Sequence, residues 1–168
     1  VRLSKITGTA GTTKLTLSGS AVVYLSPAKE DFLALGPAAP PGGRLTLTSA
    51  TPITESDVTA ASSVYLAMVD YDWTMIYDGV GWVSRQYSGE LTLTLNNPNH
   101  AINTNYDVFE FMDGTTLRVG TGPAWSSGTS RGIGAGTTEI ELFEGRLVNK
   151  VSMTARNGTT TYTVGANL

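Results

Sequence analysis

Residues 91–95 have the sequence Leu-Thr-Leu-Thr-Leu, in which apolar and polar side chains alternate with a period of two. Residues 14–18 (Lys-Leu-Thr-Leu-Ser) and 44–48 (Arg-Leu-Thr-Leu-Thr) repeat this pattern. Because successive side chains of a β-strand point to opposite faces of the sheet, each stretch predicts a strand with its leucines on a buried face. A chain built around such strands is expected to be all-β.

Further strand candidates follow at short intervals along the chain. They are 21–25, 63–69, 73–77, 82–86, 106–112, 116–120, 139–143, 147–155 and 159–164. The dipeptides Asp113-Gly114 and Asn157-Gly158 lie between pairs of these runs and predict two-residue hairpin turns, and Asp78-Gly79 predicts a third, longer one. About ten short antiparallel strands with regularly spaced turns predict a β-sandwich or a jelly-roll-like domain.

The composition agrees with this fold class and excludes several kinds of chemistry. Of the 168 residues, 25 are threonine and 19 are glycine, and 40% are hydrophobic, which is enough to build a core. The chain has no cysteine, so disulfides and thiolate chemistry are excluded. His100 is the only histidine, which rules out a His-rich metal site. We therefore expect no metal and no other cofactor.

Charge is distributed unevenly along the chain. Residues 1–50 carry five basic and two acidic side chains, whereas residues 51–110 carry eight acids and only Arg85 as a base. Such an acidic middle argues against a nucleic-acid partner, which needs clustered basic groups. No apolar run approaches the roughly 18 residues of a spanning helix, so we expect no membrane insertion. The chain begins with Val1, so a processed chain and a piece of a longer protein both remain open.

Residues 37–43, Pro-Ala-Ala-Pro-Pro-Gly-Gly, predict a linker that divides the chain in two. It separates an N-terminal segment, residues 1–36, from a β-domain, residues 44–168. The segment has two strand candidates and a short helix candidate at 26–36, with proline near its start and glycine at its end. A segment of about 40 residues is too small for an independent core. We expect it to dock on the main domain, on another subunit or on a larger assembly. Our hypothesis is that it anchors the chain or drives oligomerisation by donating strands to neighbouring copies.

One group of acids is a candidate for metal binding or acid–base catalysis. Asp70, Asp72 and Asp78 lie close together in sequence, and hard cations bind several carboxylate oxygens. The spacing of a calcium loop is absent, however, so a solvated turn between strands is the preferred interpretation.

A second group of acids has the spacing of a strand. Glu139 and Glu141 are expected on its polar face, with Ile140 and Leu142 on the inner face. A glycosidase instead needs two carboxyl groups that face each other across a cleft. We therefore assign no catalytic residue and no metal ligand, and we expect no enzyme activity.

Two loops have features that invite a functional interpretation. Residues 132–136, Gly-Ile-Gly-Ala-Gly, superficially resemble a phosphate-binding loop, but strand-like sequence follows where a helix is required. A surface loop is therefore expected there. His100 ends an asparagine-rich loop, and an exposed loop histidine is expected.

Four aromatic residues, Trp73, Tyr77, Trp82 and Trp125, are the candidate contacts for a glycan or for a protein partner. Trp73 and Tyr77 are at even spacing and share a strand face, and Trp82 is expected opposite them across the turn at 78–81. Cross-strand packing in the core is the main alternative interpretation.

An ordered series of short motifs runs through residues 43–157. It consists of 43–54, 57–59, 64–66, 76–79, 82–83, 105–109, 122–125 and 131–142, followed by Gly145 and 148–149. Taken together, the series resembles a family of bacteriophage and prophage structural proteins with tail-fibre-like or virion-surface modules. This resemblance implies a non-enzymatic, β-rich structural component of the virion surface or tail, with other virion proteins as partners. It further implies symmetric assembly, as a homotrimer or around a symmetric vertex.

Three functions therefore stay open at this point. We expect a virion structural protein, with a tail fibre, a head or tail decoration, a receptor-binding part and a connector as alternatives. The second function is a carbohydrate-binding β-sandwich that recognises host surface glycans through Trp and Tyr. The third is a glycan-cleaving enzyme that uses acids of the 70–78 or 139–144 region.

Overall fold

The computed structural model describes residues 42–96 and 98–167, all of which belong to the unit Leu35–Leu168. These residues form eleven strands, all paired antiparallel, and no helix. The prediction of an all-β, sandwich-like domain is thus confirmed for this part of the chain. The strands expected at 14–18 and 21–25 and the helix expected at 26–36 lie outside the described residues.

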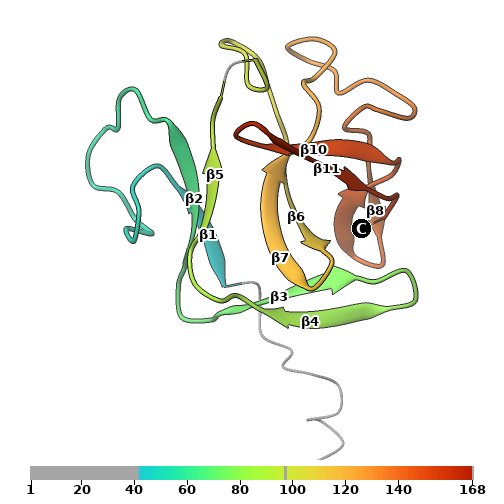
Figure 1. The fold of residues 1–168 in the computed structure, drawn as a ribbon, viewed down its shortest axis with the longest axis horizontal. Helices are drawn as coiled ribbons and strands as arrows, with labels where there is room; N and C mark the ends of the chain where they lie inside the picture. The colour runs from blue at the N-terminus through green and yellow to red at the C-terminus, as the bar shows by residue number, and fades with distance from the viewer. Residues whose placement is uncertain (1–41, 97, 168) are drawn as a thin grey trace, which may run out of the picture. The chain divides into compact units, whose positions relative to one another are not determined.

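Two sheets make up most of the fold (Figure 1). The first has the order β1-β2-β5 and consists of β1 (Gly43–Thr46), β2 (Ser63–Met68) and β5 (Leu91–Thr94). The second has the order β11-β10-β7-β6 and consists of β6 (Val108–Asp113), β7 (Thr116–Thr121), β10 (Met153–Asn157) and β11 (Thr160–Val164).

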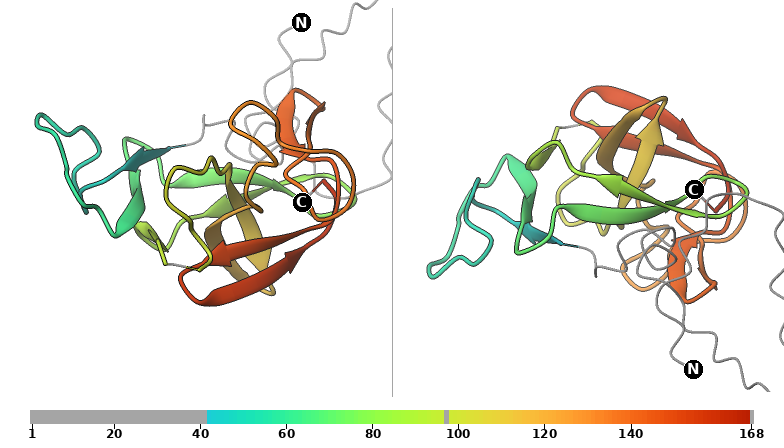
Figure 2. Two further views of the ribbon diagram at one scale, coloured as in Figure 1. Left: turned by 90° about the horizontal axis from the view of Figure 1, so that it is seen from above. Right: turned by 90° about the horizontal axis from the view of Figure 1, so that it is seen from below.

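Two separate hairpins complete the fold. They are β3 (Trp73–Tyr77) with β4 (Trp82–Gln86), and β8 (Ile140–Phe143) with β9 (Arg146–Asn149). The β3–β4 hairpin runs beneath both sheets in the view of Figure 1. Figure 2 shows the β1-β2-β5 sheet and the β8–β9 hairpin towards opposite ends of the described residues.

The side chain of Asn157 joins the two sheets. Its amide N–H groups donate to the carbonyl oxygens of Thr92 (2.7 Å) and Val119 (3.0 Å), and its oxygen accepts the N–H of Thr94 (2.9 Å). The next residue, Gly158, donates its backbone N–H to the Thr94 carbonyl at 2.8 Å. The β10–β11 turn is therefore bonded to β5 as well as to its own sheet.

The main core cluster lies on the second sheet. It consists of Phe111, Met153, Ala155 and Val164, with Phe109 and Tyr162 packed against it. Phe111 and Tyr162 have ring centroids 5.3 Å apart. The packing beside this cluster is close. A Cβ added to Gly122 would lie 2.4 Å from Thr138 Cγ2 and 2.9 Å from the Phe109 ring.

The leucine alternation is correct in β5 and wrong in β1. Leu93 of β5 is 1% exposed, whereas Leu45 and Leu47 are 48% and 42% exposed. The physical reason is that β1 is an edge strand, so no further strand of the described residues flanks Leu45, and Leu47 lies beyond the end of β1 at Thr46. Thr46 is buried instead, and its hydroxyl donates to the Thr51 carbonyl of the following loop at 2.8 Å.

Both predicted two-residue hairpins are present, but each turn begins one residue later than the predicted dipeptide. Asp113 and Asn157 are the last residues of their strands, so the turns begin at Gly114 and Gly158. Both glycines have φ of +60°. The second turn residues, Thr115 and Thr159, do not have positive φ, so both are type II′ turns, which favour glycine at the first position.

The expected strand at 147–155 is in fact two strands in two different sheets. Its first part belongs to β9, which pairs with β8 through a turn at Glu144 (φ +47°) and Gly145 (φ +84°). This pairing overturns the prediction that Leu142 points inward, because Leu142 and the opposite Leu147 are each 70% exposed. Phe143 contacts the β3–β4 hairpin, and side chains alternate along a strand, so Leu142 faces outward.

Candidate functional site

Tyr77 and Trp82 lie opposite each other in the β3–β4 hairpin, as the sequence predicted. Their ring centroids are 5.6 Å apart in an edge-to-face arrangement. Phe143 of β8 adds a third ring, 5.0 Å from Tyr77 and 6.5 Å from Trp82. We call these three residues the aromatic cluster. The sequence did not place Phe143 here because its hairpin is remote along the chain.

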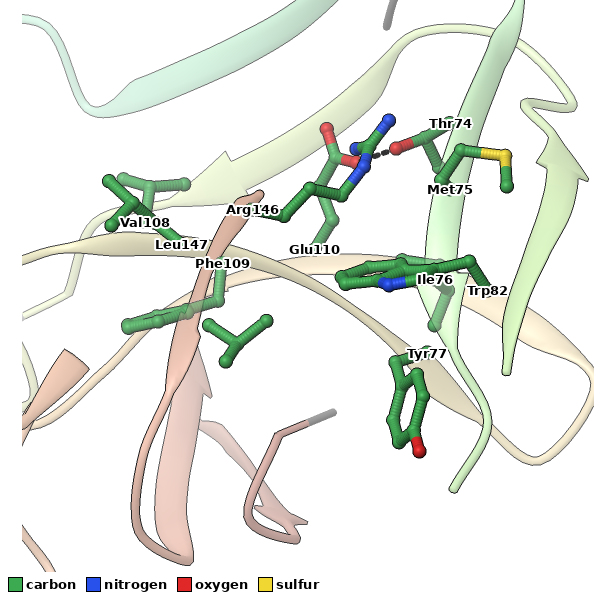
Figure 3. A pocket seen from close by; sticks show the side chains of 11 residues that line it. Thr74, Met75, Ile76, Tyr77, Trp82, Val108, Phe109, Glu110, Arg146 and Leu147 are labelled. Carbon is green, nitrogen blue, oxygen red and sulfur yellow. Dashed lines mark hydrogen bonds between the residues drawn. The ribbon is translucent and has the colours of Figure 1, made fainter. Parts of the chain in front are cut away.

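A cavity of about 290 Å³ lies beside this cluster, and we call it the aromatic pocket (Figure 3). It is bounded by residues of β3, β4, β6 and β9. The residues that line it are Thr74, Met75, Ile76, Tyr77, Trp82, Val108, Phe109, Glu110, Arg146, Leu147 and Val148. Pockets for small ligands typically begin at about 300 Å³, so this one suits a ligand of a single ring.

Glu110 is the only carboxylate among the described residues that line the pocket, and two hydroxyl groups fix it in place. Thr74 donates to its Oε2 at 2.7 Å, and Tyr87 donates to its Oε1 at 2.8 Å. Burial raises the pKa of Tyr87 well above its ordinary value of 10, so this hydroxyl keeps its proton. Each carboxylate oxygen can accept more than one hydrogen bond, so Glu110 retains acceptor capacity.

Arg146 supplies the cation of the aromatic pocket. Its guanidinium carbon lies 5.3 Å from the centroid of the Trp82 ring, within the range of a cation–π contact. None of the ion pairs or hydrogen bonds found among residues 42–96 and 98–167 involves its side chain. Its donors therefore have no partner within the described part of the chain.

Trp125 lies in a different structural unit. Its indole N–H donates to Asp107 Oδ2 at 2.8 Å, and the Arg131 guanidinium lies 4.3 Å from its ring centroid. Arg131 also holds Asp107 through two bonds of 2.7 and 2.9 Å, which raise the pKa of the arginine. This cluster ties the loop at 122–132 to the segment before β6. Sequence reasoning missed Asp107 and Arg131, which are 24 residues apart.

Trp73 is also separate from the aromatic pocket. It is half-buried at the far end of β3, opposite Gln86, and its backbone carbonyl accepts the N–H of Gly42 at 3.2 Å. Of the four aromatic candidates, the structure therefore brings together only Tyr77 and Trp82.

A second cavity, of about 670 Å³, is lined mainly by apolar residues, Leu93, Tyr106 and Trp125 among them. His100 also lines it, and the prediction of an exposed histidine is wrong. The His100 Nδ1 accepts the N–H of Asn96 at 3.0 Å, and its Nε2 lies 2.9 Å from Thr121 Oγ1. Burial lowers the pKa of His100, so the ring is neutral and has a structural role.

Two of the three candidate aspartates, Asp72 and Asp78, have local structural partners, and Asp70 lies in a left-handed backbone conformation with φ of +57°. Asp78 accepts the backbone N–H groups of Gly81 (2.9 Å) and Val80 (3.0 Å), which lowers its pKa. Asp72 accepts the side-chain amide of Gln86 at 2.7 Å. These contacts stabilise the β3–β4 hairpin and its turn.

Glu139 likewise stabilises a loop. Its carboxylate accepts the backbone N–H of Gly134 at 2.9 Å and pairs with Lys150 at 2.6 Å, and both contacts lower its pKa. The loop at 132–136 lies on the surface as predicted, with Ile133 87% exposed. Within the described residues, no three His, Asp or Glu side chains are grouped so as to hold a metal ion.

Comparisons with known proteins found no matching family model, no matching curated protein and no matching solved structure. The resemblance to phage structural proteins therefore stays a prediction from the motif series. In the part of the chain that the structure describes, no helix has the length and apolar character needed to cross a membrane.

Proposed function

We propose that this chain is a non-catalytic β-module of a bacteriophage particle, on its surface or tail, which assembles symmetrically with copies of itself. The observation that carries the proposal is the exposed leucine pair of the β8–β9 hairpin. Leu142 and Leu147 lie directly opposite each other, and each is 70% exposed. Two large apolar side chains on one exposed face indicate a surface that another molecule covers.

The expected gain from covering this pair is substantial. Full burial of a leucine side chain is worth about 1.5–3 kcal/mol, so covering the exposed part of both would contribute roughly 2–4 kcal/mol per subunit. In a closed symmetric assembly every subunit gains this amount once.

The β1 edge offers a second apolar surface of the same kind. Leu45 and Leu47 are about half exposed, and the outer edge of β1 has no partner strand within residues 42–96 and 98–167. An open edge of this sort accepts a strand from another chain. This geometry supports the hypothesis that residues 1–36 donate strands to neighbouring copies.

The assignment to a phage particle rests on the motif series. Three of its pieces, 105–109, 122–125 and 131–142, supply Asp107, Trp125 and Arg131, which form one bonded cluster. Motifs that are separate in sequence therefore belong to one structural unit. This supports the view that the series marks a single module of the kind it resembles.

The proposal is tested on purified particles. An antibody against residues 42–168 would be used for immunogold labelling of particles released from the bacterial strain that encodes the chain. We expect label at repeated, symmetric positions that withstands a high-salt wash. Recovery of the chain only in the soluble, particle-free fraction would contradict the proposal.

The aromatic pocket favours a second candidate function, the binding of host surface glycans. The pocket combines aromatic rings with one carboxylate and one guanidinium, a lining that suits a polar ring ligand. A receptor-binding module on a phage particle would have both functions.

A further inference from the structure

We infer that the aromatic pocket binds one neutral sugar ring of a glycan. This inference rests on the second candidate function and specifies its ligand class. Three properties of the pocket lead to it: the apolar wall, the pairing of one donor group with one acceptor group, and the volume.

The wall of the pocket can cover the C–H face of a sugar. Tyr77 and Trp82 both line the cavity, and Ile76 and Phe109 add further apolar surface (Figure 3). Phe143 packs edge-to-face against Tyr77 and so supports its ring from behind the cavity wall. The indole N–H of Trp82 is buried and has no acceptor among the described residues, so the ring itself is what Trp82 offers a ligand.

The polar groups of the pocket are one acceptor and one donor. Glu110 is held by Thr74 and Tyr87 and keeps spare lone pairs. The guanidinium of Arg146 lies over the Trp82 ring, but its N–H donors have no hydrogen-bond or ion-pair partner among the residues that the structure describes. A hydroxyl group both donates and accepts, so adjacent hydroxyls can donate to Glu110 while accepting from Arg146. A ligand with several hydroxyls on a small ring satisfies both groups at once.

The formal charge of the pocket selects against ions. Among the described residues, Glu110 and Arg146 are the only charged ones that line it, and their charges sum to zero. A carboxylated sugar that pairs with Arg146 would still bring its anion into the same small cavity as Glu110, and an amino sugar that pairs with Glu110 would bring its cation into the same cavity as Arg146. The like-charge repulsion offsets the attraction to the opposite charge, so an ionic sugar gains little in the pocket and still loses its hydration. The neutral sugar is therefore the preferred ligand.

The test uses the full chain labelled with ¹⁵N and titrated with methyl glycosides of glucose, galactose, mannose and N-acetylglucosamine. Glucuronate and glucosamine serve as the charged counterparts. The three tryptophans give three indole N–H signals, which single Trp→Phe variants would assign. At least one neutral glycoside is expected to shift the Trp82 signal in a saturable way and to leave the Trp125 signal in place.

The decisive variant is Arg146→Gln, with Arg118→Gln as its matched control. Arg118 also lies over an aromatic ring, that of Tyr162 at 5.7 Å, but it is on β7 and is not part of the pocket. We expect Arg146→Gln to weaken neutral-sugar binding about tenfold or more, which corresponds to about 1.4 kcal/mol. Arg118→Gln should leave the affinity unchanged.

Two other outcomes would contradict the inference, and the titrations distinguish between them. Preferential binding of glucuronate or glucosamine would keep the glycan-binding function and exclude a neutral ligand. If none of these sugars shifts the Trp82 signal, or if binding survives in Arg146→Gln, the pocket is not a sugar site. Neither result bears on self-assembly, which is measured separately.

Discussion

Replacing Asn157 with alanine tests whether one side chain joins the two sheets. The change removes three hydrogen bonds, of 2.7, 2.9 and 3.0 Å, which connect β10 to Thr92 and Thr94 of β5 and to Val119 of β7. A typical hydrogen bond contributes about 0.5–1.5 kcal/mol net, so three come to roughly 1.5–4.5 kcal/mol. Thr92 and Thr94 are exposed, and water can replace Asn157 there, so we expect the lower half of that range.

The assay is equilibrium unfolding in urea, with Asn99→Ala as the matched control. Asn99 makes one side-chain bond in the same region, to the Gly158 carbonyl at 2.8 Å. Its loss should reduce the free energy of unfolding by about 1 kcal/mol, roughly a third to two thirds of the effect of Asn157→Ala. Equal effects of the two variants, or a change below about 0.5 kcal/mol for Asn157→Ala, would refute the reasoning.

Three further predictions concern stability. Because burial lowers the pKa of His100 below 6.5, the unfolded chain binds the proton more readily. The contribution of neutral His100 to the free energy of unfolding should therefore be complete above pH 6.5 and decrease as the pH falls towards the folded-state pKa. The melting temperature of His100→Gln should lose this pH dependence. Thr138 is fully buried, and its hydroxyl has no partner among the described residues, so Thr138→Val should raise the free energy of unfolding by about 1 kcal/mol; a loss of stability would contradict this. Gly122→Ala would place a methyl group 2.4 Å from Thr138 and 2.9 Å from Phe109, and it should destabilise the fold by about 1–3 kcal/mol in urea unfolding. A Gly122→Ala protein as stable as the parent would show that this packing is looser than described.

The fold class was predictable because its signal is local. Alternation along residues 91–95 depends only on the geometry of one strand, and Leu93 is buried as that geometry requires. The same pattern failed at Leu45, because exposure there depends on the place of β1 at the edge of its sheet. The order of strands in a sheet depends on which remote segments pair with each other. The periodicity within one segment carries no information about that pairing.

The candidate site was predictable only in part, for the same reason. Tyr77 and Trp82 are joined by a short turn, so their pairing followed from the hairpin. Phe143, Glu110 and Arg146 come from three other strands, and nothing in the spacing of their neighbours indicates that they meet. Their convergence is a product of the tertiary fold.

Self-assembly through the exposed leucine pair is the central claim, and the molar mass of the protein in solution tests it most directly. Light scattering coupled to size exclusion should give about 53 kDa, three times the chain mass of 17.7 kDa. The double variant Leu142→Ser/Leu147→Ser should shift the mass towards that of one chain. The control Ile133→Ser, at a residue that is 87% exposed on the loop at 132–136, should stay assembled. A parent protein of 17.7 kDa at every concentration, or a double variant that still assembles, would contradict the account.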